Sequence, residues 1–186
     1  MASPDPQLVN AARQHAPEAW DNLLKRHQLP LYTYAAELLR DPTAALDVVQ
    51  ETFAAAVRHI ATLRDDARFS SWLFGIAHQK CVQHWRRKRR AEDVFAPVTG
   101  EDAPADWPDD TGGDPRTLLL GREHAEAFFA LVERLPPAQR SALLLHVLED
   151  FSLEEIAAIS AVPVGTVKSR LHHAKRALRQ LVEAAR

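Results

Sequence analysis

The sequence predicts an all-α protein in which an acidic, flexible linker joins two small helical domains. Outside the middle of the chain, alanine and leucine are abundant and glycine is scarce, and no alternating run of β-branched residues appears. Residues 92–116 contain four prolines, three glycines and eight acidic residues, without an apolar period. We therefore expect one domain at residues 1–91, the linker at 92–116 and a second domain at 117–186.

The formal net charge of −2 conceals an uneven distribution of charge. Residues 1–91 carry 13 Lys and Arg against 9 Asp and Glu, whereas residues 92–116 carry 1 against 8. From Gly165 onward the count is 6 against 1. Two basic regions thus flank an acidic connector, an arrangement that favours a nucleic-acid partner.

Composition also predicts the compartment. No apolar run approaches the ~20 residues that a membrane helix needs, and the first residues lack the pattern of a secretory signal. Cys81 is the single cysteine, which excludes an internal disulfide and fits a reducing environment. We expect a cytoplasmic protein.

The N-terminal domain is predicted to contain four or five helices. One helix closes with Leu38 and Leu39, and the next begins after Asp41-Pro42. A further long helix opens at Phe69 and ends in the basic run Arg86–Arg90. The apolar face of the helix that follows Asp41-Pro42 is expected to consist of Val49, Phe53, Val57 and Ile60.

The C-terminal domain is predicted to contain four helices, at about 118–134, at about 139–148, from Ser152, and over about twenty residues after Pro163. Ser152-Leu153-Glu154-Glu155 has the form of a capping box, in which the serine and the second glutamate each satisfy a backbone N–H of the other. Two helices joined by a tight turn, the second of them basic, are typical of a DNA-binding helix-turn-helix.

The last helix carries an apolar stripe beside a polar one. The apolar stripe, expected to pack on Ile156 and Ile159, consists of Val167, Leu171, Ala174, Leu178 and Leu181. The candidate DNA contacts are Thr166, Lys168, Ser169, Arg170, His173, Lys175, Arg176 and Arg179. The first turn of such a helix lies deepest in a major groove, so residues 166–170 are expected at base edges and the later cations at phosphates. A solvated basic helix or a dimerisation seam would share this pattern, although a capped helix and turn make a poor coiled coil.

Aromatic side chains, amides and positive charge combine on the long helix of the N-terminal domain. Rings suit unstacked bases, amides can bond base edges, and the basic run can bind duplex phosphates. The candidates for these contacts are Phe69, Trp72, Gln79, Gln83, Arg86, Arg87 and Arg89. Phe69 and Trp72 at this spacing are equally typical of core residues, and the basic run of a solvated helix end.

A metal centre or an active site is the alternative for His78, Cys81 and His84, which follow one another at intervals of three. A structural zinc site usually needs four ligands, and no second cluster is visible. The sequence also lacks an activated nucleophile, a phosphate loop and a paired-carboxylate arrangement. We expect no metal, no cofactor and no enzymatic activity.

Five motifs together resemble one protein family. Asp47–Phe53 (DVVQETF) and Phe69–Ala77 (FSSWLFGIA) resemble domain 2 of the extracytoplasmic-function (ECF) sigma factors of bacterial RNA polymerase. Leu135–Arg140 (LPPAQR), Ser152–Ala157 (SLEEIA) and Gly165–Leu171 (GTVKSRL) resemble domain 4 of that family. The motifs follow one another in the order and at the separations of that family, and together they extend over nearly the whole chain.

The resemblance implies a promoter-specificity subunit that binds core RNA polymerase, through the β′ clamp helices and the β flap, and promoter DNA. The clamp contact is implied for the exposed side of one helix, where Phe53 holds the helix to the core; its residues are Asp47, Gln50, Glu51 and Phe53. Leu46 stands where the family usually has an acid. An anti-sigma factor is a further implied partner.

The resemblance also divides promoter recognition between the domains. The loop at 64–71 and the helix from Trp72 would open the −10 element and capture a flipped base, while the last helix would read the −35 element. The linker would thread the RNA exit path, where its net charge of −7 could imitate RNA. A stand-alone helix-turn-helix repressor or activator is the alternative, but it leaves the motifs at 47–53 and 69–77 without a role.

Overall fold

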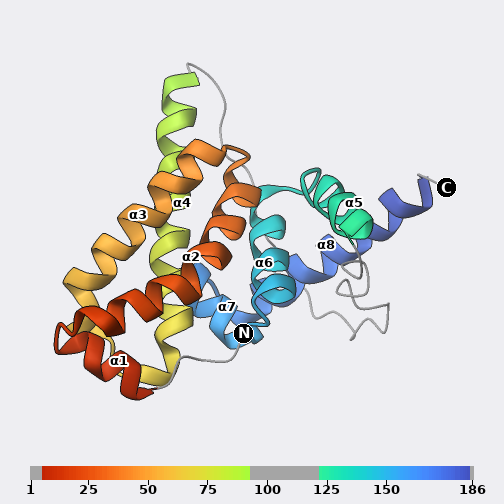
Figure 1. Cartoon of the computed structure of the whole chain (residues 1–186). Coiled ribbons are helices and arrows are strands. Elements are labelled where there is room, and N and C mark those ends of the chain that lie inside the picture. The colour runs from red at the N-terminus through yellow and green to blue at the C-terminus, as the bar shows by residue number, and fades with distance from the viewer. Residues whose placement is uncertain (1–5, 93–121, 185–186) are drawn as a thin grey trace. The chain divides into compact units, whose positions relative to one another are not determined.

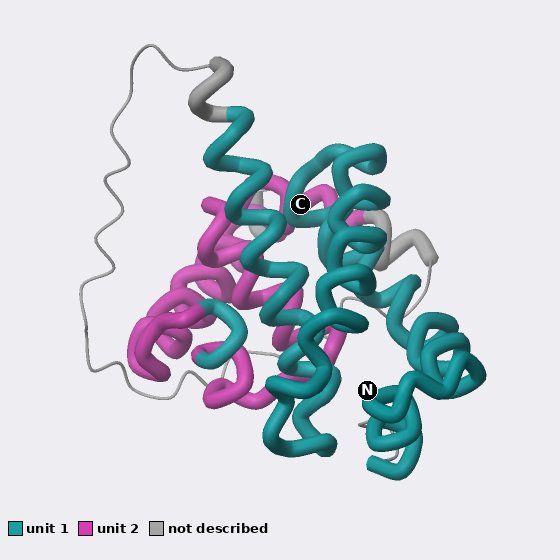
Figure 2. The backbone as a smooth tube through the Cα atoms, turned by 90° about the vertical axis from the view of Figure 1, so that its left-hand side faces the viewer, with its two compact units in different colours: residues 1–97, 158–160 teal, residues 98–157, 161–186 magenta. Residues whose placement is uncertain are grey.

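Helices account for all the regular structure in the residues that the computed structural model describes, which are 6–92 and 122–184 (Figure 1). The chain divides into two units, one of residues 1–97 with 158–160 and one of residues 98–157 with 161–186 (Figure 2). The all-α prediction is therefore confirmed. The predicted linker lies outside the described residues except for Glu92, the last residue of the long helix.

Four α-helices form the N-terminal unit: α1 (Pro6–Arg13), α2 (Pro17–Leu39), α3 (Pro42–His59) and α4 (Phe69–Glu92). Helix α2 packs against α1, α3 and α4, and α3 also packs against α4. Two short 3₁₀ turns, η1 (Ile60–Thr62) and η2 (Asp66–Arg68), connect α3 to α4. This arrangement places α2 at the centre of the unit.

The boundary between α2 and α3 follows from local chemistry, as the sequence predicted. Arg40 ends α2 in the left-handed conformation, with φ of 58°, and its N–H donates to the carbonyl of Ala36 at 2.8 Å. The Asp41 carboxylate then accepts from the N–H groups of Thr43 and Ala44, at 3.1 and 3.0 Å. Pro42 follows at a position where a missing N–H has no cost.

The predicted apolar face of α3 is wrong in part. Val57 is 42% exposed and Val49 is only half-buried, whereas Phe53 and Ile60 are buried as expected. The buried face consists of Ala44, Ala45, Val48, Thr52, Phe53 and Ala56. Three alanines let α3 approach its neighbours closely, so a prediction that followed the largest apolar side chains misplaced the face.

The C-terminal unit contains the four predicted helices, α5 (Arg122–Val132), α6 (Pro137–Leu148), α7 (Leu153–Ser160) and α8 (Val164–Ala184). The capping box is confirmed: Ser152 Oγ accepts from the Glu155 N–H at 3.2 Å, and the Glu155 carboxylate accepts from the Ser152 N–H at 2.9 Å. At the end of α5, buried Arg140 donates to the carbonyls of Glu133 and Leu135, at 2.8 and 3.0 Å.

Leucines of α6 form the core of this unit together with the apolar stripe of α8. Leu143, Leu144 and Leu145 are fully buried. The stripe of α8 is buried at Val167, Leu171, Ala174 and Leu178, and Leu181 is half-buried. Helix α8 packs most extensively against α6, so the expected packing on Ile156 and Ile159 of α7 is secondary, although both isoleucines are buried.

Candidate nucleic-acid interface

Helix α8 presents cations on the side opposite its buried stripe. Lys168, Arg176 and Arg179 are exposed, and Thr166, Arg170, His173 and Lys175 are half-buried. Ser169, also predicted as a contact, is only 2% exposed in this structure. The basic face therefore begins at the first turn of α8 and continues along the helix.

The start of α4 is a buried junction rather than an exposed aromatic surface. The Phe69 ring is fully buried, with its centroid 5.4 Å from the His27 ring in an edge contact and 5.8 Å from the Trp72 ring. Phe69 is thus a core residue, as one of the two interpretations had it, and it supports a partly exposed Trp72. In this structure the Trp72 ring is accessible for stacking on a base, and the Phe69 ring is not.

Buried polar partners fix this junction. The Ser70 hydroxyl lies 3.1 Å from Nε2 of His27, whose Nδ1 lies 2.9 Å from the carbonyl of Leu23. Because a carbonyl only accepts, Nδ1 of His27 is the donor and Nε2 accepts from Ser70. Burial lowers the pKa of His27, which keeps the ring neutral. A second hydrogen bond joins the Tyr34 hydroxyl to Nδ1 of His78 at 2.8 Å.

The solvent side of α4 carries the remaining predicted contacts. Gln79 and Gln83 are exposed, as are Arg86 and Arg87. Arg89 belongs to α4, but its side chain lies outside the described residues. Amides therefore precede cations along one accessible helix, an order that suits an unpaired strand leading into a duplex.

A second kind of surface covers α2 and α3. Asp47, Gln50 and Glu51 are exposed as predicted, and Glu51 accepts a hydrogen bond from Lys80 at 2.8 Å, which lowers the pKa of Glu51. Phe53 is buried, so it holds α3 in place and cannot touch a partner directly.

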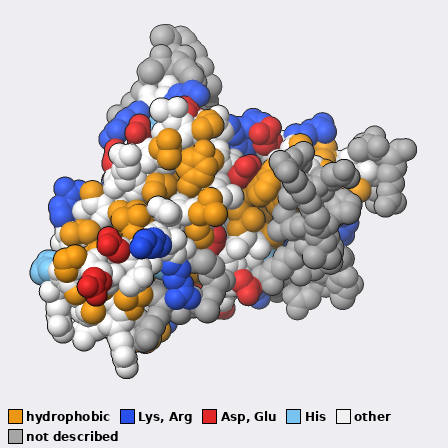
Figure 3. Space-filling view, viewed as in Figure 1, with side chains coloured by type: hydrophobic (Ala, Val, Ile, Leu, Met, Phe, Trp, Pro, Cys, Tyr) orange, Lys and Arg blue, Asp and Glu red, His pale blue; other side chains and the backbone are white. Residues whose placement is uncertain are grey.

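Hydrophobic side chains gather on the same two helices, in the face that Figure 3 shows. Helix α2 exposes Leu24 and Leu29, the latter at 67%, and α3 exposes Leu46 and Val57. Exposed apolar groups rimmed by acids are typical of a protein-binding surface. The sequence analysis noted Leu46 but did not predict this patch, because α2 has no single apolar stripe that would set these leucines apart.

The His78, Cys81 and His84 group is not brought together as a metal site. Cys81 is fully buried, and burial raises the pKa of its thiol to about 12. His78 is engaged with Tyr34. Within residues 6–92 and 122–184, no three His, Cys, Asp or Glu side chains are placed to hold a metal ion. Among the described helices, none combines the length and apolar character needed to cross a bilayer.

Sequence reasoning missed two residues, Arg13 and His27, that hold the segments around the start of α4. Arg13 of α1 hydrogen-bonds to Leu63 and Asp66 in the α3–α4 connection, and His27 of α2 bonds to Ser70 at the start of α4. These three partners lie 43 to 53 positions away along the chain. No local pattern marks either residue.

Comparisons with known proteins agree with this geometry. Residues 23–91 match the family described as Sigma-70 region 2, and residues 125–178 match Sigma-70, region 4. The RNA polymerase sigma-H factor of Pseudomonas aeruginosa is 33% identical over 178 residues, which cover 94% of this chain and 91% of that protein. The ECF RNA polymerase sigma-E factor of Escherichia coli strain K12 is 31% identical over 185 residues, covering 96% and 94%.

Solved structures show the same fold. CnrH, determined in complex with the cytosolic domain of CnrY, superposes with a TM-score of 0.68 at 25% identity and covers 97% of each chain. The sigma factor RpoE from Bartonella quintana, determined with the anti-sigma factor NepR, gives a TM-score of 0.62 at 24% identity, covering 89% of this chain and 99% of that one. The matches to both sigma-70 regions and to full-length relatives show that the chain belongs to the ECF sigma factors, which direct promoter-specific transcription initiation by RNA polymerase.

Proposed function

We propose that the two units of this sigma factor read separate elements of one promoter, with boundaries at residues 1–91, 92–116 and 117–186. The C-terminal unit would read the −35 element through α8, and the N-terminal unit would open and bind the −10 element. The observation that carries this proposal is the division of α8 into a buried stripe and a face with exposed Lys168, Arg176 and Arg179. A helix divided in this way can enter a major groove while remaining packed on its unit.

On α8, position along the helix separates base contacts from phosphate contacts. Thr166, Lys168 and Arg170 lie in the first two turns and are the proposed base readers. Lysine or arginine there can bond the O6 and N7 edge of guanine. Further along, His173, Lys175, Arg176 and Arg179 are the proposed phosphate contacts.

In the N-terminal unit, the α3–α4 connection and the exposed side of α4 are the proposed −10 site. Opening duplex DNA costs a few kcal/mol per unstacked step, so the exposed bases need new partners. Trp72 offers a partly exposed ring, and Gln79 and Gln83 offer amides. Arg86 and Arg87 would hold the adjoining duplex phosphates, together with Arg89.

The α2–α3 surface is the proposed docking site for core polymerase. Exposed Asp47, Gln50 and Glu51 share α3 with the exposed apolar side chains of Leu46 and Val57, a mixture that suits the β′ clamp helices. The C-terminal unit would contact the β flap. RNA synthesis then belongs to the core enzyme, this chain contributes no catalysis, and both work in the cytoplasm. An anti-sigma factor is a further proposed partner, in line with the complex of RpoE with NepR.

Reconstitution with core polymerase tests the proposal. The chain should bind purified core and select a start site in vitro, whereas a stand-alone repressor would bind duplex sites without polymerase. Start-site mapping after overexpression supplies the promoter. Arg170→Ala should then reduce discrimination between matched and mismatched −35 sequences by about 1–3 kcal/mol. Gln180→Ala is the matched control, because Gln180 is an exposed neutral residue of the same helix.

Each outcome has a definite meaning. An equal loss on all −35 sequences would reassign Arg170 to a phosphate contact. Arg176→Ala should weaken binding to every −35 sequence alike and reduce the salt dependence of binding. No association with core polymerase, together with no selected start site, would overturn the proposal as a whole.

A further inference from the structure

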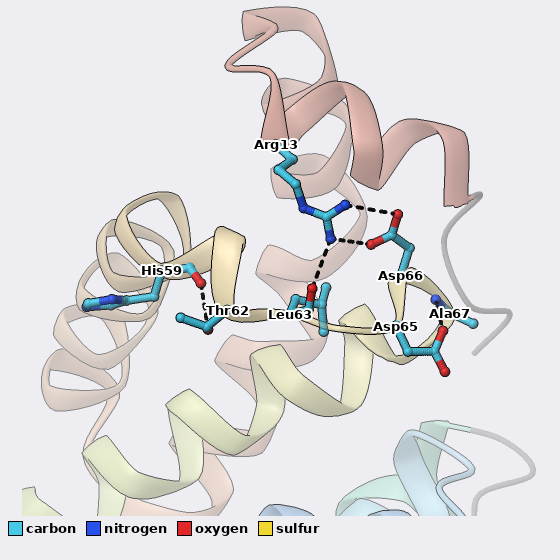
Figure 4. A network of polar contacts seen from close by, with 7 residues as sticks. All are labelled: Arg13, His59, Thr62, Leu63, Asp65, Asp66 and Ala67. Carbon is cyan, nitrogen blue, oxygen red and sulfur yellow. Dashed lines mark hydrogen bonds and ion pairs between the residues drawn. The ribbon is translucent and has the colours of Figure 1, made fainter.

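Arg13 connects the first helix to the segment between α3 and α4 (Figure 4). It is the last residue of α1. Its Nη2 donates to the carbonyl of Leu63 at 3.0 Å and to Oδ1 of Asp66, while its Nη1 lies 3.5 Å from Oδ2 of the same carboxylate. One guanidinium thus holds a backbone carbonyl and both oxygens of a carboxylate, which is the geometry that its planar fork favours.

The connecting segment is built of two short turns, and Arg13 binds both. Within η1, the Thr62 hydroxyl donates to the carbonyl of His59 at 2.7 Å. At η2, the Asp65 carboxylate accepts from the N–H of Ala67 at 3.0 Å. Leu63 follows the first turn and Asp66 begins the second. Arg13 therefore fixes the position of one turn relative to the other, which the local hydrogen bonds within each turn do not do.

Helix α1 is itself well anchored, so Arg13 acts from a fixed base. Val9 and Ala12 are fully buried, and Nε1 of Trp20 donates to the carbonyl of Ala12 at 3.0 Å. The side chains of Arg13 and Asp66 are 31% and 21% exposed. Partial burial of both partners strengthens their attraction relative to a pair in open water.

The segment that Arg13 holds leads directly into the proposed −10 site. Phe69 and Ser70 begin α4 at the residue after η2, and Trp72 follows one turn later. The pairing also offsets the negative charge of Asp66, Arg68 in turn pairs with Asp65 at 3.4 Å, and the side chain of Arg64 is exposed to solvent. A DNA phosphate near this segment would thus meet Arg64 and two paired carboxylates rather than an unpaired one.

We propose that Arg13 is a positioning residue for promoter opening: it holds the α3–α4 connection in the shape that receives an unpaired base of the −10 element. This inference rests on the proposed function of the N-terminal unit. Arg13 acts through Leu63 and Asp66 and does not contact DNA. Its loss should impair capture of the unpaired strand without affecting recognition of the −35 duplex or binding to core polymerase.

The test uses holoenzyme assembled from core polymerase and the full chain carrying Arg13→Ala. The probe is a single-stranded oligonucleotide with the −10 sequence of a promoter found by start-site mapping. Arg13→Ala should weaken capture of this oligonucleotide about tenfold, the size expected for losing charge-assisted hydrogen bonds. The rate of open-complex formation should fall with it. Affinity for a −35 duplex fragment and for core polymerase should stay at the wild-type value.

Three further variants separate positioning from general stability. Gln14→Ala changes the adjacent exposed residue of the chain and should behave as wild type. Arg13→Lys keeps the charge but lacks the fork, so it should retain a clear defect. In the double variant Arg13→Ala with Asp66→Asn, the defect should be smaller than the sum of the two single defects, because both act on one contact.

The inference fails if Arg13→Ala captures the oligonucleotide as well as wild type does. It also fails if the variant loses core binding and −35 binding to the same degree, since that result would indicate a general loss of folding. Failure of the proposed function is distinct, because wild-type holoenzyme would then not prefer the −10 oligonucleotide over a scrambled one.

Discussion

The two units differ in how far apart in the sequence their polar partners lie. In the N-terminal unit, four side-chain hydrogen-bonded pairs join residues 29 to 53 positions apart, beside local ones such as that of Asp41 with Thr43. In the C-terminal unit, the hydrogen bonds that close helix ends join residues three to seven positions apart. The long-range pairs are Arg13–Asp66, His27–Ser70, Tyr34–His78 and Lys80–Glu51.

This difference fits the tasks of the two units. A hydrogen bond constrains direction as well as distance, so distant polar partners can hold the α3–α4 connection in one shape. Apolar packing tolerates more variation and suits a unit that only has to present one rigid helix. The N-terminal unit, for which we propose the opening of DNA, would thus depend on specific polar contacts, and the C-terminal unit, the proposed −35 reader, on its core.

The largest effect is expected in the core of the C-terminal unit. Leu144 of α6 is fully buried, so Leu144→Ala should lower the free energy of unfolding of this unit by about 2–5 kcal/mol, because a cavity remains. Urea titrations followed by the NMR signals of α6 and α8 measure this loss. Leu148→Ala, at a half-buried position, should cost clearly less. Equal losses would mean that burial in this core does not set the stability of the unit.

The pH dependence that Glu149 gives to the C-terminal unit is a second test of the difference between the two units. Glu149 directly follows the last residue of α6 and is 5% exposed, and burial raises its pKa from 4.5 to about 7. The folded unit binds the proton more tightly than the unfolded chain, so this stabilisation is full below pH 4.5 and is lost as pH rises through about 7. Glu149→Gln should therefore stabilise the unit at alkaline pH, by about 1–3 kcal/mol, and flatten its pH dependence. A variant with the wild-type pH profile would contradict this assignment.

His27 should give the N-terminal unit the opposite pH dependence. Burial lowers the pKa of His27 below 6.5, so its contribution is full above pH 6.5 and is lost as pH falls through the folded-state pKa. His27→Phe should remove that dependence. At neutral pH it should cost about 1–3 kcal/mol, because the Ser70 hydroxyl loses its acceptor. NMR signals of α2 and α4 during urea titration measure both effects.

A second substitution identifies the cause of that loss. Adding Ser70→Ala to His27→Phe should recover part of the stability, since removing both partners leaves no buried hydroxyl unsatisfied. If the double variant is no more stable than His27→Phe alone, the hydrogen bond is not the source of the effect.

The same contrast explains which features could be predicted from the sequence. The helix ends at Asp41-Pro42 and Ser152 were predicted correctly, because their hydrogen bonds lie within three residues. Arg13 and His27 were missed because their partners are brought close only by the fold. On α3, alanines rather than the larger Val57 face the core. Burial of Phe69 could not be separated from a base-stacking role, since both give the same helical spacing.

Removal of the α7 cap should have a smaller effect. Ser152→Ala deletes the hydroxyl that accepts from the Glu155 N–H, and it should destabilise the C-terminal unit by about 0.5–2 kcal/mol. Ser152→Thr is the matched control, because threonine keeps the hydroxyl that caps the helix and that donates to the Glu155 carboxylate. Urea titration with the NMR signals of α7 measures both variants. A loss as large as that of Leu144→Ala would show that this unit, too, depends on a polar contact.

The smallest effect is expected for the pair Lys80–Glu51, whose Nζ and Oε2 atoms lie 2.8 Å apart. The Glu51 side chain is 56% exposed, and an ion pair in contact with water contributes about 0.2–1 kcal/mol. The hydrogen bond from Lys80 lowers the pKa of Glu51 below 4.5, so the contribution is present above pH 4.5 and is lost as pH falls through the folded-state pKa. A double-mutant cycle with Glu51→Gln and Lys80→Gln measures the coupling energy.

The size of that coupling decides how far the contrast between the units extends. A value under about 1 kcal/mol, weakened further by salt, would confine the specific long-range contacts to those of Arg13, His27 and Tyr34. Glu51 could then switch from Lys80 to a docked partner with little loss of stability. A coupling as strong as that of His27 with Ser70 would instead mean that docking through Glu51 has to break a stabilising contact. Lys80→Gln would then separate stability from polymerase binding, because it removes the contact and leaves Glu51 in place.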